Sequence, residues 1–136
     1  MRLKEYQVRA LEALSRYLAL LSDATDKAEK ARAAIAALPE DLRASLAAAP
    51  DPVAPAWDEA RKQKIAAAPH PWRELKDGLG RSIPHVCLKL PTGGGKTLLA
   101  AHGLDRILVS HFRQTAGLVL WIVPSEAIYA QTKAQL

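Results

Sequence analysis

Three consecutive glycines followed by Lys96 and Thr97 constrain this 136-residue chain more than any other feature. They follow a short β-favouring run at residues 85–90 and precede a stretch of helix-forming residues at 97–112. A glycine-rich loop that ends in Gly-Lys-Thr and lies between a strand and a helix is typical of phosphate-binding loops. The general pattern has a further glycine at its start, where this chain has Leu90. We therefore predict a nucleotide-binding site here, in preference to a flexible turn that only joins a strand to a helix.

The residue types in the loop suit a bound phosphate. Successive backbone N–H groups and the N-terminus of the next helix attract an anion, and glycine permits the positive φ angles that the close approach requires. We expect Lys96 to reach the β- and γ-phosphates and the Thr97 hydroxyl to bind Mg²⁺. The predicted nucleotide contacts in the loop are Thr92, Gly93, Gly94, Gly95, Lys96 and Thr97, and Thr97 is also the predicted metal ligand.

The last fifty or so residues are expected to alternate strands and helices. Residues 117–123 are continuously apolar, as in a strand that is buried on both faces, and residues 126–136 have a helical composition. A strand, loop, helix and second strand predict a right-handed parallel crossover with its ligand at the carboxyl ends of the strands. We therefore expect an α/β fold. Cys87 lies within the first predicted strand and is expected to be a buried, reduced thiol.

The N-terminal part reads as mostly helical. Apolar residues recur every three or four positions over residues 4–38, which predicts an amphipathic helix that ends before Pro39. We expect further helices at 41–49 and 57–68, separated by the proline-rich linker 50–55.

The net charge of +5 comes mainly from the C-terminal part, because residues 81–136 carry six Lys and Arg against two Asp and Glu. This excess favours a polyanionic partner such as nucleic acid, although a phosphate site needs some of the same charge. The sequence has no apolar run of membrane-spanning length and no signal-peptide core at its N-terminus. We therefore expect a cytoplasmic protein without a membrane segment.

Three blocks together resemble the start of a superfamily-two DEAD/DEAH-box helicase motor, nearest to the type III restriction enzyme helicase subunits. Residues 3–11, with Tyr6 and Gln7, resemble the glutamine motif, and residues 91–97 resemble motif I, which in this superfamily commonly lacks the leading glycine. Residues 123–132, which include Pro124, Ser125 and Gln131, resemble motif Ia.

The resemblance implies an ATP- and Mg²⁺-dependent motor on DNA, with RNA as an open alternative and methylase or specificity subunits of a restriction system as further partners. It implies that Gln7 recognises adenine and that Pro124 and Ser125 contact nucleic acid. By this comparison residues 1–22 form the glutamine-motif helix and 23–82 a helical insertion and linker. Residues 83–136 would then begin a RecA-like P-loop domain with parallel strands, incomplete after motif Ia.

Two departures limit what the resemblance implies. Many family members have an arginine where this chain has Glu126, and an acid cannot contact a phosphate. No segment after Lys96 resembles motif II, the apolar strand ending in Asp-Glu that holds Mg²⁺ and activates water. We therefore expect the opening segment of a motor rather than a complete enzyme. A phosphotransferase or P-loop module that does not act on nucleic acid, and an inactive fragment, remain alternatives.

Overall fold

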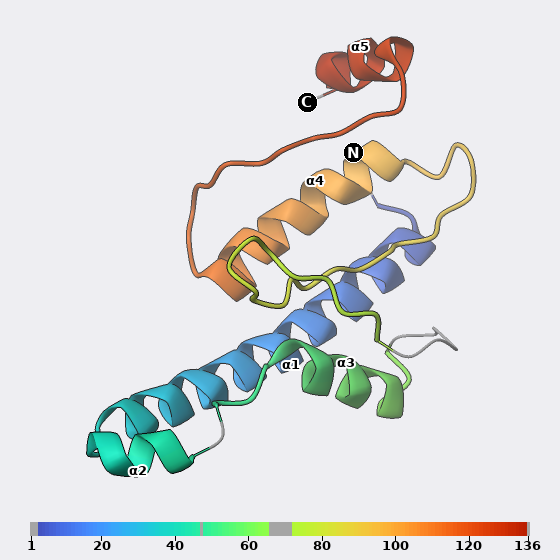
Figure 1. The fold of residues 1–136 in the computed structure, drawn as a ribbon. Helices are drawn as coiled ribbons and strands as arrows, with labels where there is room; N and C mark the ends of the chain where they lie inside the picture. The colour runs from blue at the N-terminus through green and yellow to red at the C-terminus, as the bar shows by residue number, and fades with distance from the viewer. Residues whose placement is uncertain (1–2, 47, 66–71, 136) are drawn as a thin grey trace. The chain divides into compact units, whose positions relative to one another are not determined.

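The computed structural model describes residues 3–46, 48–65 and 72–135, which are mostly helical (Figure 1). In chain order the elements are α1 (Glu5–Ala36), α2 (Glu40–Ser45), α3 (Val53–Lys62), α4 (Lys96–Arg106), the π-helix η1 (Ile107–Phe112) and α5 (Glu126–Gln135). Two compact units are present: unit 1 contains Met1–Leu14 and Leu88–Leu136, and unit 2 contains Ser15–Cys87. Within the described ranges, no helix is both long and apolar enough to cross a membrane.

Helix α1 follows directly from the apolar spacing in the sequence. Leu11, Leu14, Leu18 and Leu21 recur at three or four residues, and all four are buried. The helix ends at Ala36, three residues before Pro39, which cannot continue a helix without losing a hydrogen bond. The predicted helix over 4–38 is therefore confirmed.

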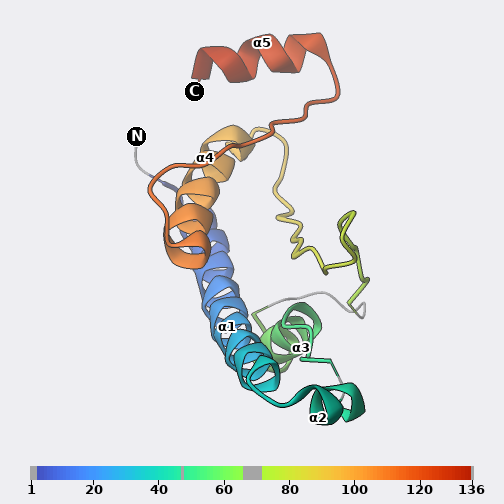
Figure 2. The same cartoon turned by 60° about the vertical axis from the view of Figure 1, so that its left-hand side comes forward.

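The core of unit 2 lies between α1 and α3, which are neighbours in both views (Figures 1 and 2). Small alanine side chains on α3 let the two helices approach closely, and the Trp57 ring packs edge-on against Tyr17 at 5.9 Å between centroids. The buried members of this core are Tyr17, Leu21, Val53, Ala56 and Ala60.

Helix α3 begins earlier than the sequence predicted. The Asp51 carboxylate accepts a hydrogen bond from the Val53 N–H at 2.8 Å, and Pro52 occupies the N-cap. The helix therefore starts within the expected proline-rich linker and ends at Lys62, so the bounds predicted for it were wrong. Residues 66–68 of the predicted helix lie outside the described residues.

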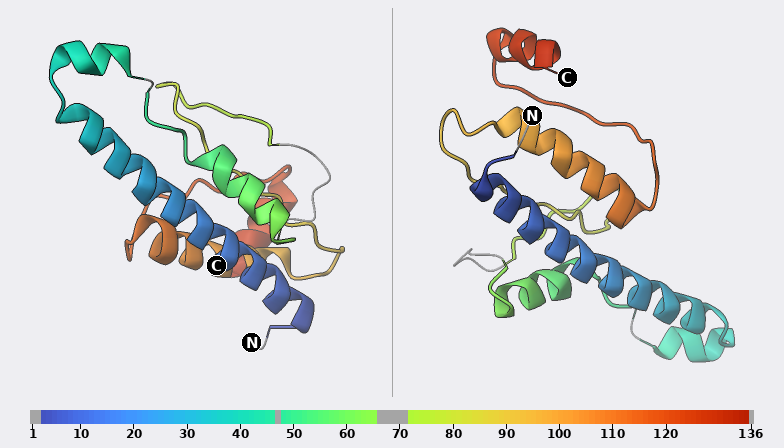
Figure 3. Two further views of the ribbon diagram at one scale, coloured as in Figure 1. Left: turned by 90° about the horizontal axis from the view of Figure 1, so that it is seen from below. Right: turned by 180° about the vertical axis from the view of Figure 1, so that it is seen from behind.

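In unit 1, helix α4 packs against the first turns of α1 (Figure 3). Leu99 and Gly103 are buried, and a Cβ at Gly103 would lie 3.4 Å from Leu14 Cδ2, so this glycine permits close contact. The helix continues into η1, and the residue after η1, Arg113, has a left-handed φ of 54°. The helix expected over 97–112 is present, with its last part wound as a π-helix.

The predicted α/β fold with parallel strands is not what the structure shows. Residues 85–90 and 117–123 run as irregular chain, and the described residues contain no strand, only an isolated antiparallel bridge between Lys76 and Ser82. An apolar, β-branched run favours a strand only where a neighbour takes up its backbone hydrogen bonds, and two strands alone are marginal in water. The RecA-like core expected from the sequence is therefore a wrong prediction for this structure.

The expected burial of these two segments fails for the same reason. Cys87 is exposed rather than buried. In the second segment Leu118, Leu120 and Ile122 are almost fully exposed, because no sheet covers them. Trp121, in the same run, is only half-buried.

Candidate nucleotide-binding site

The glycine-rich loop forms a tight turn directly before α4. The Pro91 carbonyl accepts a hydrogen bond from the Gly94 N–H at 3.0 Å, which closes the turn. Gly93 and Gly95 have positive φ angles of 73° and 69°. The Gly95 carbonyl then accepts the Leu99 N–H at 3.0 Å and so opens the helix. The first N–H groups of α4 consequently have no partner within the helix, which suits this end of α4 to an anion.

Lack of space favours glycine at two positions of the loop, and at the second, Gly95, the positive φ angle favours it as well. A Cβ on Gly94 would lie 2.8 Å from the Pro91 carbonyl oxygen, closer than van der Waals contact allows. A Cβ on Gly95 would lie 2.6 Å from Gln7 Nε2. Gly93 has open space around it, so only its φ angle calls for glycine.

Gln7 connects the start of α1 to this loop. Its Nε2 donates a hydrogen bond to the Gly94 carbonyl at 2.9 Å, and its side chain is buried. Its Oε1 accepts the Lys4 N–H at 2.8 Å, while the Lys4 carbonyl accepts the first helical bond, from Val8, at 3.0 Å. Gln7 therefore occupies the third helical position and makes half of a capping box. Both ends of its carboxamide have a partner in this chain.

Tyr6 binds the same carbonyl from the same turn of α1. Its hydroxyl donates to the Gly94 oxygen at 3.1 Å, and its ring is half-buried. The sequence left two alternatives for Tyr6, stacking on adenine or simple packing, and did not indicate this bond. The partner is a backbone carbonyl 88 residues away, which no side-chain pattern encodes.

Lys96 is the first residue of α4, and its side chain is exposed. Its Nζ donates to the Pro91 carbonyl at 3.0 Å, the same oxygen that accepts the Gly94 N–H. An ammonium has three donors, so this bond leaves others for a phosphate. Thr97 follows in the first turn and is half-buried, and Thr92 is exposed at the start of the loop.

The structure thus brings three of the seven predicted ATP contacts into one hydrogen-bonded network in unit 1. Gln7, Gly94 and Lys96 are joined through the Gly94 peptide and the Pro91 carbonyl, and Gly95 lies against Gln7. Recognition of adenine by Gln7, and of Mg²⁺ by Thr97, stay predictions.

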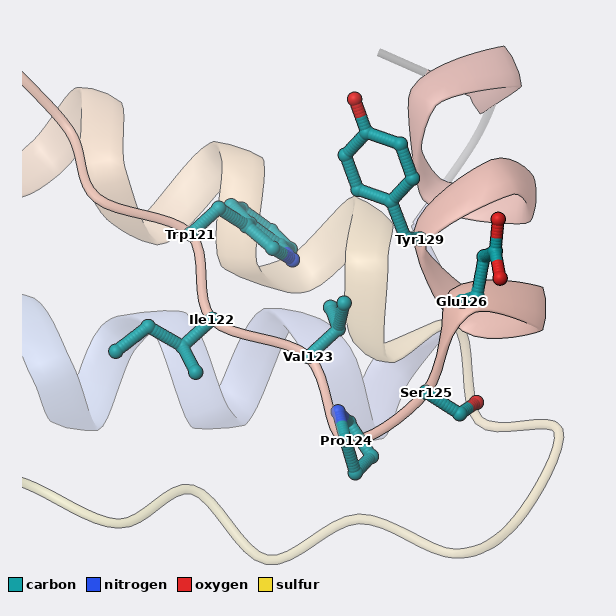
Figure 4. Close-up of a pocket in the computed structure, with 7 residues that line it drawn as sticks. All are labelled: Trp121, Ile122, Val123, Pro124, Ser125, Glu126 and Tyr129. Carbon is teal, nitrogen blue, oxygen red and sulfur yellow. The ribbon is translucent and has the colours of Figure 1, made fainter.

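The predicted nucleic-acid residues lie at the start of α5 and have a local role there. Ser125 Oγ accepts the Ile128 N–H at 3.4 Å and its carbonyl accepts the Tyr129 N–H at 3.0 Å, so Ser125 caps the helix. Pro124 and Ser125 line an open hollow whose other residues are Trp121, Ile122, Val123, Glu126 and Tyr129 (Figure 4). The side chain of Gln131, in the same predicted motif, lies outside the described residues.

A family model described as type III restriction enzyme, res subunit, matches residues 1–136. No curated protein matches the chain, and no solved structure does.

Proposed function

We propose that this chain, which belongs to the family of type III restriction enzyme res subunits, binds the triphosphate of ATP through the loop at residues 92–97. The observation that supports the proposal is the bonded network around Gly94 at the N-terminus of α4. This network holds the glycine-rich turn and Lys96 at the N-terminus of α4, and a helix N-terminus favours negative charge.

Magnesium belongs to the same proposal. Mg²⁺ usually keeps several waters and binds one or two protein oxygens together with phosphate oxygens. Thr97 stands next to Lys96 in the first turn of α4 and offers one hydroxyl oxygen, which fits such a site. Bound Mg²⁺ would neutralise charge on the phosphates, and the chain's own part is to hold them at the loop.

We further propose DNA as the polymeric partner of this chain. The basic excess of residues 81–136 supports it, and Pro124 and Ser125 at the α5 N-terminus are the proposed contacts. Glu126 lines the same hollow and would oppose a phosphate there. We therefore propose that a DNA strand would be contacted here by backbone N–H groups and the Ser125 hydroxyl rather than by a charged side chain.

The ATP proposal is tested by calorimetry on Lys96→Ala. Charge-assisted hydrogen bonds contribute about 1.5–3 kcal/mol, so the variant should bind Mg²⁺–ATP about ten- to a hundredfold more weakly than the wild type. Lys89→Ala is the matched control, because Lys89 is an exposed lysine outside residues 92–97. Equal ATP affinity for Lys96→Ala and Lys89→Ala would show that the loop is not the nucleotide site.

A further inference from the structure

The Gly94 carbonyl is held by two side chains at once. Tyr6 Oη donates to it at 3.1 Å and Gln7 Nε2 at 2.9 Å, and the residue that carries it is buried. Both donors come from the first turn of α1, and all three residues belong to unit 1. A carbonyl oxygen has two lone pairs, so these two bonds use its full acceptor capacity.

Fixing this carbonyl also fixes the N–H on the other side of the same peptide. A trans peptide is planar, with its C=O and N–H pointing in opposite directions. The Gly94 oxygen points at Tyr6 and Gln7, so the Gly95 N–H points away from them. Gly95 is the N-cap of α4, so its N–H lies among the donors that can face an anion at that helix end.

The Gly94–Gly95 peptide has little else to hold it. Neither residue has a side chain, and glycine populates positive and negative φ about equally, so this peptide could rotate easily in an unanchored loop. Each rotated state would turn the carbonyl oxygen, rather than the N–H, toward a phosphate. The two α1 donors therefore select the orientation in which an anion meets a hydrogen-bond donor.

We propose that Tyr6 is a positioning residue for phosphate recognition: its hydroxyl, together with Gln7, holds the Gly94–Gly95 peptide with its N–H available to the triphosphate. The inference rests on the proposed function of residues 92–97 and adds a role for a tyrosine outside that loop. Because Tyr6 acts on phosphate contacts, its contribution is the same for every base.

A positioning role for Tyr6 contributes equally to the binding of any nucleotide, whereas stacking of Tyr6 on adenine depends on the base, so the two roles can be distinguished. Removal of the Tyr6 hydroxyl leaves the ring available to stack. A stacking role would therefore survive Tyr6→Phe, whereas a positioning role would not. Inorganic tripolyphosphate has no base at all, so its affinity depends on the phosphate contacts alone.

The test compares wild type, Tyr6→Phe and the control Tyr17→Phe for binding of Mg²⁺ complexes of ATP, GTP and tripolyphosphate. Tyr17 is a buried tyrosine of α1 in unit 2, and its hydroxyl has no hydrogen-bond partner among the described residues. Tyr6→Phe should weaken the binding of all three ligands by a common factor of about two to ten, the worth of one net hydrogen bond. Tyr17→Phe should change none of the three affinities.

A second measurement checks the contact without any ligand. In the ligand-free protein, Tyr6→Phe should shift the ¹³C resonance of the Gly94 carbonyl and the amide resonance of Gly95, and Tyr17→Phe should leave both in place. Unchanged resonances, unchanged affinities, or a loss confined to ATP would each overturn the proposal. Failure of the wild type to bind any of the three ligands would instead refute the proposed function itself, and the resonances would still show whether Tyr6 holds the peptide.

Discussion

Replacing Gly95 by alanine should damage the site far more than the same change at Gly93, although both glycines have nearly the same backbone conformation. Their φ angles are 69° and 73°. Placing an L-residue in the left-handed region lowers the free energy of unfolding by about 1–2 kcal/mol. The lower conformational freedom of alanine in the unfolded chain raises the free energy of unfolding by about 0.4–1 kcal/mol. This backbone effect, about 1 kcal/mol net, applies equally at both positions.

The steric effect applies at Gly95 only. A Cβ there would lie 2.6 Å from Gln7 Nε2, whereas a Cβ at Gly93 meets nothing within 4 Å. Gln7 is buried and cannot move aside without losing its bond to Gly94, and a buried polar group left unpaired costs about 1–3 kcal/mol. Gly95→Ala should therefore destabilise the folded state by about 2–4 kcal/mol in total, whereas Gly93→Ala should destabilise it by about 1 kcal/mol.

Native-state hydrogen exchange at the Leu99 amide measures the loss of stability at the junction between the loop and α4. That N–H donates to the Gly95 carbonyl at 3.0 Å, so its protection reports opening of the junction between loop and helix. In a Gln7→Ala background the alanine side chain at position 95 no longer meets the carboxamide. The destabilisation caused by Gly95→Ala should then fall to that caused by Gly93→Ala. Equal losses for Gly93→Ala and Gly95→Ala in the wild-type background would refute the reasoning.

Two further predictions concern the base and the reaction. If Gln7 reads adenine, the wild type should prefer ATP over GTP by about 1–3 kcal/mol in calorimetry, and Gln7→Ala should abolish that preference; equal affinities in the wild type would refute the adenine prediction. The isolated polypeptide should not turn over ATP, because phosphoryl transfer needs Mg²⁺ held on two sides and a group that positions water. The sequence provides no Asp-Glu pair after Lys96 for that purpose. Hydrolysis that is stimulated by DNA and lost in Lys96→Ala would contradict this prediction.

Features with local signals were predictable from the sequence. The glycine-rich turn before α4 comes from a contiguous motif, and α1 follows from the spacing of four leucines. The assignment to the restriction-type family, made from three short blocks, is confirmed by the family model over residues 1–136. In each case neighbouring residues along the chain carry the information.

The failures concern interactions between distant segments. The apolar run at 117–123 has the composition of a buried strand, but composition does not state whether a neighbouring strand is present to pair with it. In the described residues it has none, and its leucines are exposed. The contact of Tyr6 with Gly94 was likewise unpredictable, since a backbone carbonyl accepts a bond whatever residue carries it.

Gly95 shows why the two motifs have to be considered together. As the N-cap of α4 it needs a left-handed conformation, which the phosphate-loop pattern explains. The absence of a Cβ also makes room for the Gln7 carboxamide, a requirement that comes from α1 and that the loop pattern does not explain. Asparagine can adopt a left-handed conformation, and it would meet the first requirement but not the second. The third glycine of the run is therefore determined jointly by the turn before α4 and by a glutamine 88 positions earlier in the sequence.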